Sequence, residues 1–245
     1  MAQHTIYLIT GANRGIGLGL TKALLGRPNT VVIAAVRDPA TQAFQGIHLA
    51  ENSKLIIAKI DSKSATDAAE AMKTLQKEHG ITKIDTVIAN AGISKFVGPV
   101  INTPISEIRD HFEVNTISIV VLFQAVWPLL SASSQPRLVT LSTGTGSIGG
   151  MGDLPFPFLA YGLSKSGVNY ITRKISFEHP DLIAFPISPG WVQTDMGTAG
   201  AKANGMEDAP VSLKDSVSGI LRQIDNSTKA TSGTFAGFDG VSFPW

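Results

Sequence analysis

A short apolar segment near the start of the chain runs directly into a glycine-rich turn. Residues 5–10 (TIYLIT) have the composition of a strand, residues 11–17 (GANRGIG) follow at once, and Leu18, Leu20 and Leu24 then recur at helical spacing. Glycines let the backbone turn tightly and approach a pyrophosphate, while a helix N-terminus supplies free N–H groups and a positive dipole end. This order predicts a nucleotide-binding unit of an α/β sheet. The alternative is a glycine-lined junction used only for close packing.

Strand-like and helical segments alternate along the rest of the chain. We expect further strands at residues 30–35, 55–60, 86–89, 137–141, 182–188 and 234–238. Helices are expected at residues 64–79, 105–130 and 161–177, with a capping box at 212–215 opening another. The alternation predicts a Rossmann-type α/β fold, with a doubly wound parallel sheet of about seven strands in a single domain, residues 1–245.

Composition narrows the possible partners. The chain has 245 residues, a net charge of +1 and no run of basic residues, so we expect neither nucleic acid nor an anionic membrane as partner. The lack of cysteine excludes disulfides, thiolate metal ligands and cysteine nucleophiles, and we expect no metal. The most apolar stretch, residues 117–130, is short of the roughly 18 residues of a membrane span and is interrupted by Gln124 and Pro128. A signal peptide is not expected either, so a cytoplasmic protein is the default.

The residues after the second expected strand bear on the choice of nucleotide. Asp38 lies about 20 residues beyond the glycines, where a carboxylate would accept the ribose 2′-OH of NAD. Arg37 would instead pair with the 2′-phosphate of NADP, and Arg14 adds a second positive charge in the glycine turn. Asp38 has another role open to it, because Asp followed by Pro39 is a favourable N-cap and N1 pair. The sequence therefore favours NADP(H).

Polar residues follow other strands in the same way. Asp61 ends the third expected strand and would be either a helix cap or a ligand of the adenine edge. Residues 90–92 (NAG) follow the fourth, where the asparagine amide would shape a cofactor wall or close a turn. Asn115 lies inside the expected helix 105–130, which is an unfavourable position and requires partners if the side chain is buried. A functional role would explain why an asparagine occupies this position.

Tyr161 and Lys165 are four residues apart on the expected helix 161–177 and so share one face. A lysine ammonium beside a phenol favours the phenolate and lowers the pKa of tyrosine from about 10, which would prepare the phenol to give or take a proton. The alternative is that the two residues only form part of a solvent-exposed helix face and have no catalytic role. On the opposite side Leu163, Tyr170 and Phe177 form an apolar stripe that needs cover, from a partner subunit or from packing within the chain. We expect a homodimer or homotetramer through this helix.

Two loops have the composition of covers for a pocket. Residues 144–158 are rich in glycine and then in proline and phenylalanine, and residues 195–210 are small and aperiodic, as in a lid. Large apolar residues on loops near the expected pocket mouth are candidates for substrate contact; alternatively they fill the core or the underside of the lid. They are Phe96, Met151, Phe156, Phe158, Trp191 and Met196.

Residues 10–17, 90–92, 142–143 and 189–190, together with Asn115, Tyr161 and Lys165, resemble the short-chain dehydrogenase/reductase family over the whole chain. Residues 137–174, 188–196 and 237–245 are most similar to fungal ketoreductases of the norsolorinic acid ketoreductase type and to sniffer-like carbonyl reductases. The ordered set of motifs is far more specific than any one of them.

The resemblance implies an NADPH-dependent reductase of an apolar ketone or aldehyde, aromatic or polyketide-like, in secondary metabolism or detoxification. Tyr161 would protonate the carbonyl oxygen, Lys165 would lower the phenol's pKa and hold the nicotinamide ribose, and Asn115 would position a water. The cofactor half would be about residues 1–135 and the catalytic half about 136–245. Cofactor contacts would come from Gly11, Asn13, Arg14, Gly15, Ile16, Gly17, Arg37, Asp61, Asn90, Ala91, Gly92, Tyr161, Lys165, Pro189, Gly190, Val192 and Thr194, the last two at the carboxamide and pyrophosphate end.

One position departs from the family pattern, in which the second of two serines after the fifth strand carries the catalytic hydroxyl. Here the pair is Ser142-Thr143, so the role falls by position to Thr143, with Ser142 as the fallback and Ser147 third. The interval from Thr143 to Tyr161 also exceeds the family's usual gap by a few residues, which enlarges the loop over the substrate. Two other functions remain open: NAD-dependent alcohol oxidation at the same site, and a non-catalytic NADP-sensing or scaffold protein.

Overall fold

The computed structural model describes residues 4–245 and contains one parallel sheet with the strand order β3-β2-β1-β4-β5-β6-β7. The strands are β1 (Thr5–Thr10), β2 (Thr30–Val36), β3 (Lys54–Lys59), β4 (Thr86–Ala89), β5 (Arg137–Leu141), β6 (Ile183–Ser188) and β7 (Ala236–Gly237). The predicted Rossmann-type doubly wound sheet is confirmed. The order reverses between β1 and β4, and a crevice opens beyond the carboxyl ends of strands at such a switch point.

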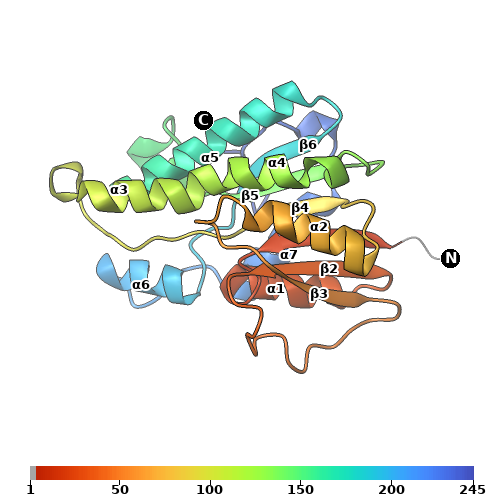
Figure 1. Cartoon of the computed structure of the whole chain (residues 1–245). Coiled ribbons are helices and arrows are strands. Elements are labelled where there is room, and N and C mark those ends of the chain that lie inside the picture. Colours follow the sequence, from red (N-terminus) through yellow and green to blue (C-terminus); the bar gives the residue numbers. More distant parts are fainter. Residues whose placement is uncertain (1–3) are drawn as a thin grey trace.

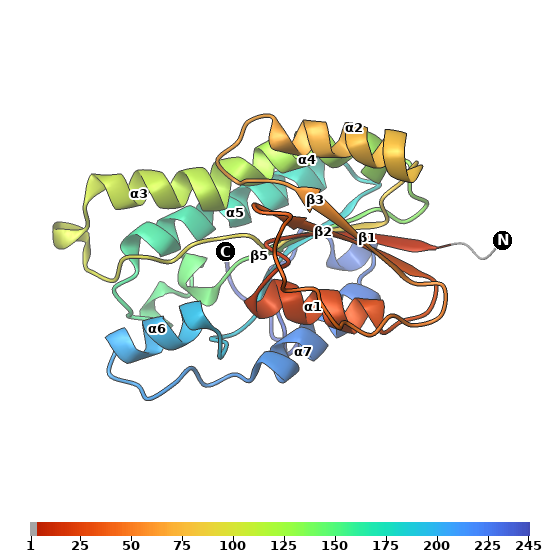
Figure 2. The same cartoon turned by 60° about the horizontal axis from the view of Figure 1, so that its bottom comes forward.

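Helices cover both faces of this sheet (Figure 1). On one face lie α2 (Asp67–His79), α4 (Ser118–Leu130) and α5 (Leu159–Glu178). On the other lie α1 (Gly15–Leu25) and α7 (Leu213–Asp225), which Figure 2 shows side by side. The remaining helices are α3 (Ile105–Phe112) and α6 (Asp195–Ala203), with short 3₁₀ turns at Val100–Asn102, Gly144–Gly146, Met151–Asp153 and Lys229–Thr231.

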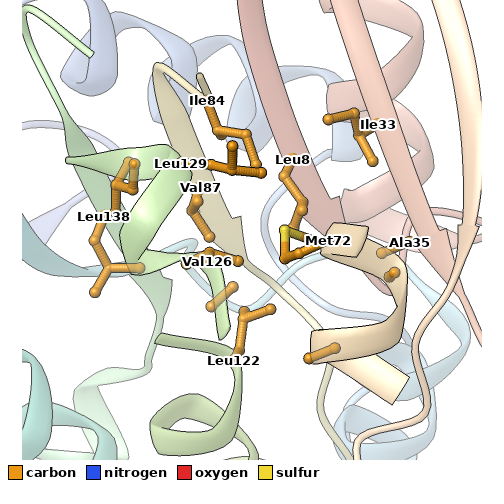
Figure 3. Close-up of a cluster of buried hydrophobic side chains, with 14 of the residues drawn as sticks. Leu8, Ile33, Ala35, Met72, Ile84, Val87, Leu122, Val126, Leu129 and Leu138 are labelled. Atoms are coloured by element: carbon orange, nitrogen blue, oxygen red, sulfur yellow. The ribbon is translucent and has the colours of Figure 1, made fainter. Parts of the chain in front are cut away.

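Each face of the sheet buries its own apolar cluster. Leu8 and Val87 of the sheet pack with Met72 of α2 and with Leu122 and Val126 of α4, as Figure 3 shows. The other cluster joins the alternate strand residues to α1 and α7. Full burial of one such side chain contributes about 1.5–3 kcal/mol. The near-continuous apolar strands of the sequence therefore follow from burial on both faces.

The helix expected at 105–130 contains a wide turn. α3 continues through a π-helical segment, Glu113–Ile117, into α4. Such segments inside α-helices occur frequently at functional sites, and this one contains Asn115. By length and composition alone the 26-residue helix could cross a membrane, a possibility that the apolar-run argument did not anticipate. Core helices pass the same test, and the inner side of α4 is buried against the sheet.

Two local expectations are wrong. Asp38 does not cap a helix after β2: its Oδ1 accepts a hydrogen bond from Ala40 N at 3.0 Å, and the described chain from 37 to 53 contains no helix. An aspartate that bonds two residues ahead forms a turn of its own. The expected aperiodic lid at 195–210 begins instead with α6, because Thr194 Oγ1 accepts from Gly197 N at 3.1 Å and so caps a helix.

Pro186 lies inside β6, although proline is unfavourable in a strand because it has no N–H to donate. Two residues to either side, Ala184 O accepts from Gly233 N (2.8 Å) and Ser188 O accepts from Phe238 N (2.9 Å). Backbone groups alternate in direction along a strand, so the missing N–H of Pro186 falls on this same side. The two-residue β7 pairs only with the last two residues of β6, and the proline therefore removes no ladder hydrogen bond.

Candidate active site

A cleft of about 440 Å³ opens at the carboxyl ends of the strands, beside the switch point. It is lined by the N-terminal turn of α1, the residues that follow β1 to β6, and the start of α6. Most of the predicted site residues meet here although they are far apart in the sequence. They are Gly11, Asn13, Arg14, Gly15, Ile16, Arg37, Asp61, Asn90, Ala91, Gly92, Ser142, Tyr161, Lys165, Pro189, Thr194 and Met196.

The glycine turn brings backbone segments very close together. Gly11 and Gly15 have φ of 63° and 51°, values that favour glycine. A Cβ on Gly17 would lie 2.3 Å from Gly11 O and 2.6 Å from Asn90 Nδ2. The N-cap position of α1 is Arg14, whose side chain makes no capping hydrogen bond. The first-turn N–H groups therefore remain available to an anion in the cleft, as the cofactor-binding interpretation requires.

Asn90 ties this turn to the neighbouring strand. Its Nδ2 donates to Thr10 O (2.8 Å) and Gly11 O (3.2 Å). In return Thr10 Oγ1 accepts from the backbone N–H groups of Asn90 and Ala91, both at 3.0 Å. The Asn90 amide thus closes the structure at the strand end, and Asn90 also lines the cleft. Its predicted contact with the cofactor stays a prediction.

Cationic side chains outnumber carboxylates in the cleft lining. Arg14, Arg37, Lys63, Lys95 and Lys165 line it with Asp61 and Asp195, and the predicted NAD ligand Asp38 is not among the described lining residues. Asp61 Oδ1 accepts from Lys63 N at 2.9 Å, and the N-cap of α2 is Thr66, so Asp61 is not a helix cap. The charge suits a phosphorylated ligand.

Tyr161 and Lys165 meet in the cleft on the inner face of α5. Lys165 is 4% exposed, and its ammonium donates to Leu141 O at 2.5 Å while lying 5.9 Å from the centre of the Tyr161 ring. Burial raises the pKa of Tyr161 to about 12 and lowers the pKa of Lys165 to about 8. Desolvation dominates the pKa of Tyr161 in this structure, so the phenol is protonated at neutral pH. The expected lowering of that pKa by Lys165 stays a prediction.

Asn115 is fully buried, and its amide is fully hydrogen-bonded. Oδ1 accepts from Ile93 N (2.8 Å), and Nδ2 donates to Ile93 O (2.9 Å) and to Ser164 Oγ (2.9 Å). These partners explain why an asparagine is tolerated inside the helix. The side chain joins the residues after β4 to α5, next to Lys165. Its predicted role of positioning a water stays a prediction.

The three candidate hydroxyls have different surroundings. Ser142 is 2% exposed and donates to Asn169 Oδ1 at 2.5 Å. Thr143 Oγ1 lies 3.2 Å from Thr145 Oγ1, and Thr143 is not among the described cleft residues. Ser147 donates to Pro244 O and accepts from Gly150 N (2.9 Å), so its hydroxyl is committed to the loop itself.

Of the six predicted substrate contacts, only Met196 lines the described cleft. Trp191 packs edge-on against Phe156 and Phe158, with ring centres at 5.0 and 6.1 Å, and its Nε1 donates to Gly197 O at 2.8 Å. These three rings thus fasten the 150s loop to α6. Met151 is 62% exposed. Phe96 packs on its own loop, where a Cβ on Gly98 would lie 2.5 Å from its ring.

Other predicted residues lie behind the cleft wall. Gly190 has φ of 81° and packs against Phe238, and Val192 is buried and bridges to Val211. Residues that sequence reasoning missed also line the cleft: Val36, Ile60, Ser62, Lys63, Ile93, Lys95, Val114, Leu141 and Asp195. The positions of Val36, Ile60 and Leu141 at strand ends could have indicated them. Lys63 and Lys95 lie on loops, where no hydrophobic periodicity in the sequence could have indicated them.

Sheet, glycine turn and cleft together define a dinucleotide-binding α/β protein. A family model for short chain dehydrogenases matches residues 5–204. Norsolorinic acid ketoreductase of Aspergillus parasiticus is 43% identical over 249 residues, covering 99% of this chain and 92% of that protein. The Dothistroma septosporum norsolorinic acid ketoreductase is 42% identical over 251 residues, covering 100% of this chain and 94% of that protein.

Solved structures of carbonyl reductases have the same fold as this chain. NADPH-bound carbonyl reductase from chicken fatty liver has a TM-score of 0.85 at 26% identity and covers 100% of both chains. Carbonyl reductase Sniffer of D. melanogaster has a TM-score of 0.85 at 26% sequence identity, covering 99% of this chain and 100% of that chain. This chain belongs to the short-chain dehydrogenase family. The predicted family, and with it an oxidoreductase, is confirmed.

The close approach at Gly17 generates a stability prediction. Gly17→Ala places a methyl group against Gly11 O, and relief of that clash must move backbone, so we expect a loss of about 1–3 kcal/mol in unfolding free energy. Urea denaturation measures it. Gly152→Ala is the control, because a Cβ there meets nothing within 4 Å. Equal midpoints for the two variants would contradict the packing account.

Proposed function

We propose that this protein is an NADPH-dependent reductase of ketones or aldehydes. The observation that carries the proposal is the half-buried Tyr161 and the buried Lys165 in one cleft with the glycine turn and with Arg14 and Arg37. The norsolorinic acid ketoreductases among its relatives support a ketone substrate and a role in secondary metabolism. We also place the enzyme in the cytoplasm, with a small apolar carbonyl compound as substrate.

NADPH suits the charges of the cleft better than NADH. Arg14 and Arg37 line it, whereas Asp38, the one residue expected to accept a ribose hydroxyl, has its Oδ1 bound to Ala40 N. The uncapped first turn of α1 would hold the pyrophosphate and the arginines the 2′-phosphate. When bound, NADPH supplies the hydride that reduces the carbonyl carbon.

The chain's own residues handle the proton. Tyr161 keeps its hydrogen at neutral pH because burial raises its pKa, and it would donate that hydrogen to the carbonyl oxygen as negative charge develops there. Lys165 would stabilise the phenolate that remains and hold the ribose. A phenol that is protonated at rest favours reduction over alcohol oxidation, in which Tyr161 would have to begin as the base.

A second hydroxyl would position the carbonyl oxygen. We favour Thr143 over Ser142, because Ser142 already donates its hydrogen to the buried Asn169 at 2.5 Å. Thr143 does not line the described cleft, but among the described residues its hydroxyl has only the hydroxyl and N–H of Thr145 as partners, at 3.2 and 3.3 Å. Its hydroxyl is therefore the easier one to redirect toward a substrate.

Replacing the proton donor tests the proposed chemistry. We expect Tyr161→Phe to lower kcat by about 10²–10⁴-fold, the usual contribution of a positioned general acid, with the Kd for NADPH unchanged. NADPH absorbance loss with a panel of ketones, aldehydes and quinones measures it, and NADH run in parallel tests the nucleotide choice. Tyr170→Phe is the matched control, since Tyr170 lies on the same helix and is 72% exposed. Full activity in Tyr161→Phe would refute the mechanism, and NADPH binding without any turnover would support the sensor alternative.

The buried ammonium makes cofactor binding depend on pH. Burial lowers the pKa of Lys165 to about 8, so its positive charge is present below that pH and is lost as the pH rises through it. NADPH affinity should therefore be highest below about pH 8 and weaken toward pH 10, as measured by fluorescence titration. Tyr161→Phe should keep this decline, because the tyrosine titrates only near 12, whereas Lys165→Met should bind weakly at every pH. A decline that persists in Lys165→Met would assign it to another group.

The outer face of α5 supports the expected oligomer. Leu163, Tyr170 and Phe177 are 44%, 72% and 71% exposed, so no described segment of the chain covers this stripe. We expect a dimer or tetramer through α5 in sedimentation at micromolar concentration. Tyr170→Glu with Phe177→Glu should yield a folded monomer, because two charges cannot be buried in an apolar interface without partners. A wild type that sediments as a monomer would remove the proposal.

A further inference from the structure

The residues after β4 form an irregular wall of the cleft. Gly92, Ile93 and Lys95 line it, and the backbone here is neither helix nor strand. A Cβ on Gly92 would lie 3.6 Å from Lys165 Nζ, so this wall lies directly against the catalytic lysine. Irregular backbone must satisfy its polar groups with side chains or water. Asn115 does so for Ile93, and the neighbouring turn of α3 does so for Lys95.

His111 holds the backbone of Lys95. The imidazole is fully buried, Nε2 lies 3.1 Å from Lys95 N, and Nδ1 lies 2.7 Å from Glu107 O. A backbone N–H can only donate and a carbonyl can only accept. Nε2 must therefore be the acceptor and Nδ1 must carry the hydrogen, which is the arrangement of a neutral imidazole. Protonation at Nε2 would replace the acceptor with a second donor and break the bond to Lys95.

Asp110, the residue before His111, holds the side chains of two cleft loops. Its Oδ2 binds Lys95 Nζ at 2.6 Å, and its Oδ1 binds the ammonium of Lys63. Both lysines line the cleft, Lys63 from the loop after β3 and Lys95 from the loop after β4. The two ammonium groups lower the pKa of the Asp110 carboxyl to about 2, so it stays ionised throughout the working pH range.

We propose that Asp110 and His111 form a clamp that holds the Lys63 and Lys95 loops in the conformation that binds the cofactor. The two are positioning residues, because they act through the loops and do not line the described cleft themselves. The inference rests on the proposed function only in taking NADPH as the cleft's ligand. It assigns a purpose to a buried histidine and to a doubly paired aspartate that the reduction chemistry does not use.

The test compares His111→Gln, which keeps an acceptor near the Nε2 position, with His111→Leu, which has none. We expect hydrogen exchange at the Lys95 amide of the ligand-free protein to rise about tenfold in His111→Leu, with a similar weakening of the Kd for NADP⁺ at pH 7.5, as the loss of one hydrogen bond implies. His111→Gln should match the wild type in both measurements. His79→Gln, at an exposed histidine, is the control.

Asp110→Asn tests the second half of the clamp. Asp181→Asn is the matched control, because Asp181 also pairs with a lysine, Lys229 at 2.8 Å, but on the exposed surface. Asp110→Asn should raise the Kd for NADP⁺ several-fold, and Asp181→Asn should not. Unchanged Lys95 exchange and unchanged Kd in His111→Leu would overturn the clamp. If His111→Leu does not fold, Asp110→Asn decides: a Kd for NADP⁺ equal to the wild type's overturns the proposal. A wild type that fails to bind NADP⁺ would refute the proposed function instead, while amide exchange would still test the clamp.

Discussion

The site depends on the reciprocal hydrogen bonds between Thr10 and Asn90, which join the ends of β1 and β4 where the strand order reverses. Parallel strands that wind in opposite directions from this point leave a crevice between their loops. Asn90 lines this crevice, and the missing side chain of Gly17 lets the first turn of α1 approach the Asn90 amide. The N-terminus of α1, with its unpaired first-turn N–H groups, is thereby placed at the crevice.

The opposite side of the cleft is organised by one interrupted helix. The π-helical segment between α3 and α4 carries the buried Asn115, and the preceding turn carries Asp110 and His111. All three direct their polar atoms at the residues after β4. The helix thus supplies the hydrogen bonds that the irregular backbone lacks. Burial in this region raises the pKa of Tyr161 and lowers that of Lys165, so packing sets the protonation states of both groups.

Much of this could be predicted from the sequence. The strands, the glycine turn and the Tyr161–Lys165 pair follow from short-range patterns, because strand burial, backbone turning and helical spacing each depend on neighbouring residues. Two short sequence patterns that fit more than one local structure led to wrong predictions. Asp38-Pro39 has the form of a helix start but forms a turn, and the small residues after Thr194 have the composition of a lid but form α6.

The sequence by itself determined the fold class, the family and the placing of Tyr161 and Lys165 on one helix face, since each depends on residue type and spacing. Tertiary structure alone decided which groups share the cleft and how they are charged. Lys63, Lys95 and Asp110 come from three separate segments, and no spacing rule relates them. Whether Lys165 would acidify Tyr161 depended on burial and on the Leu141 carbonyl that engages the ammonium. Desolvation is a property of the whole packed structure, so only the fold could set the order of those two pKa values.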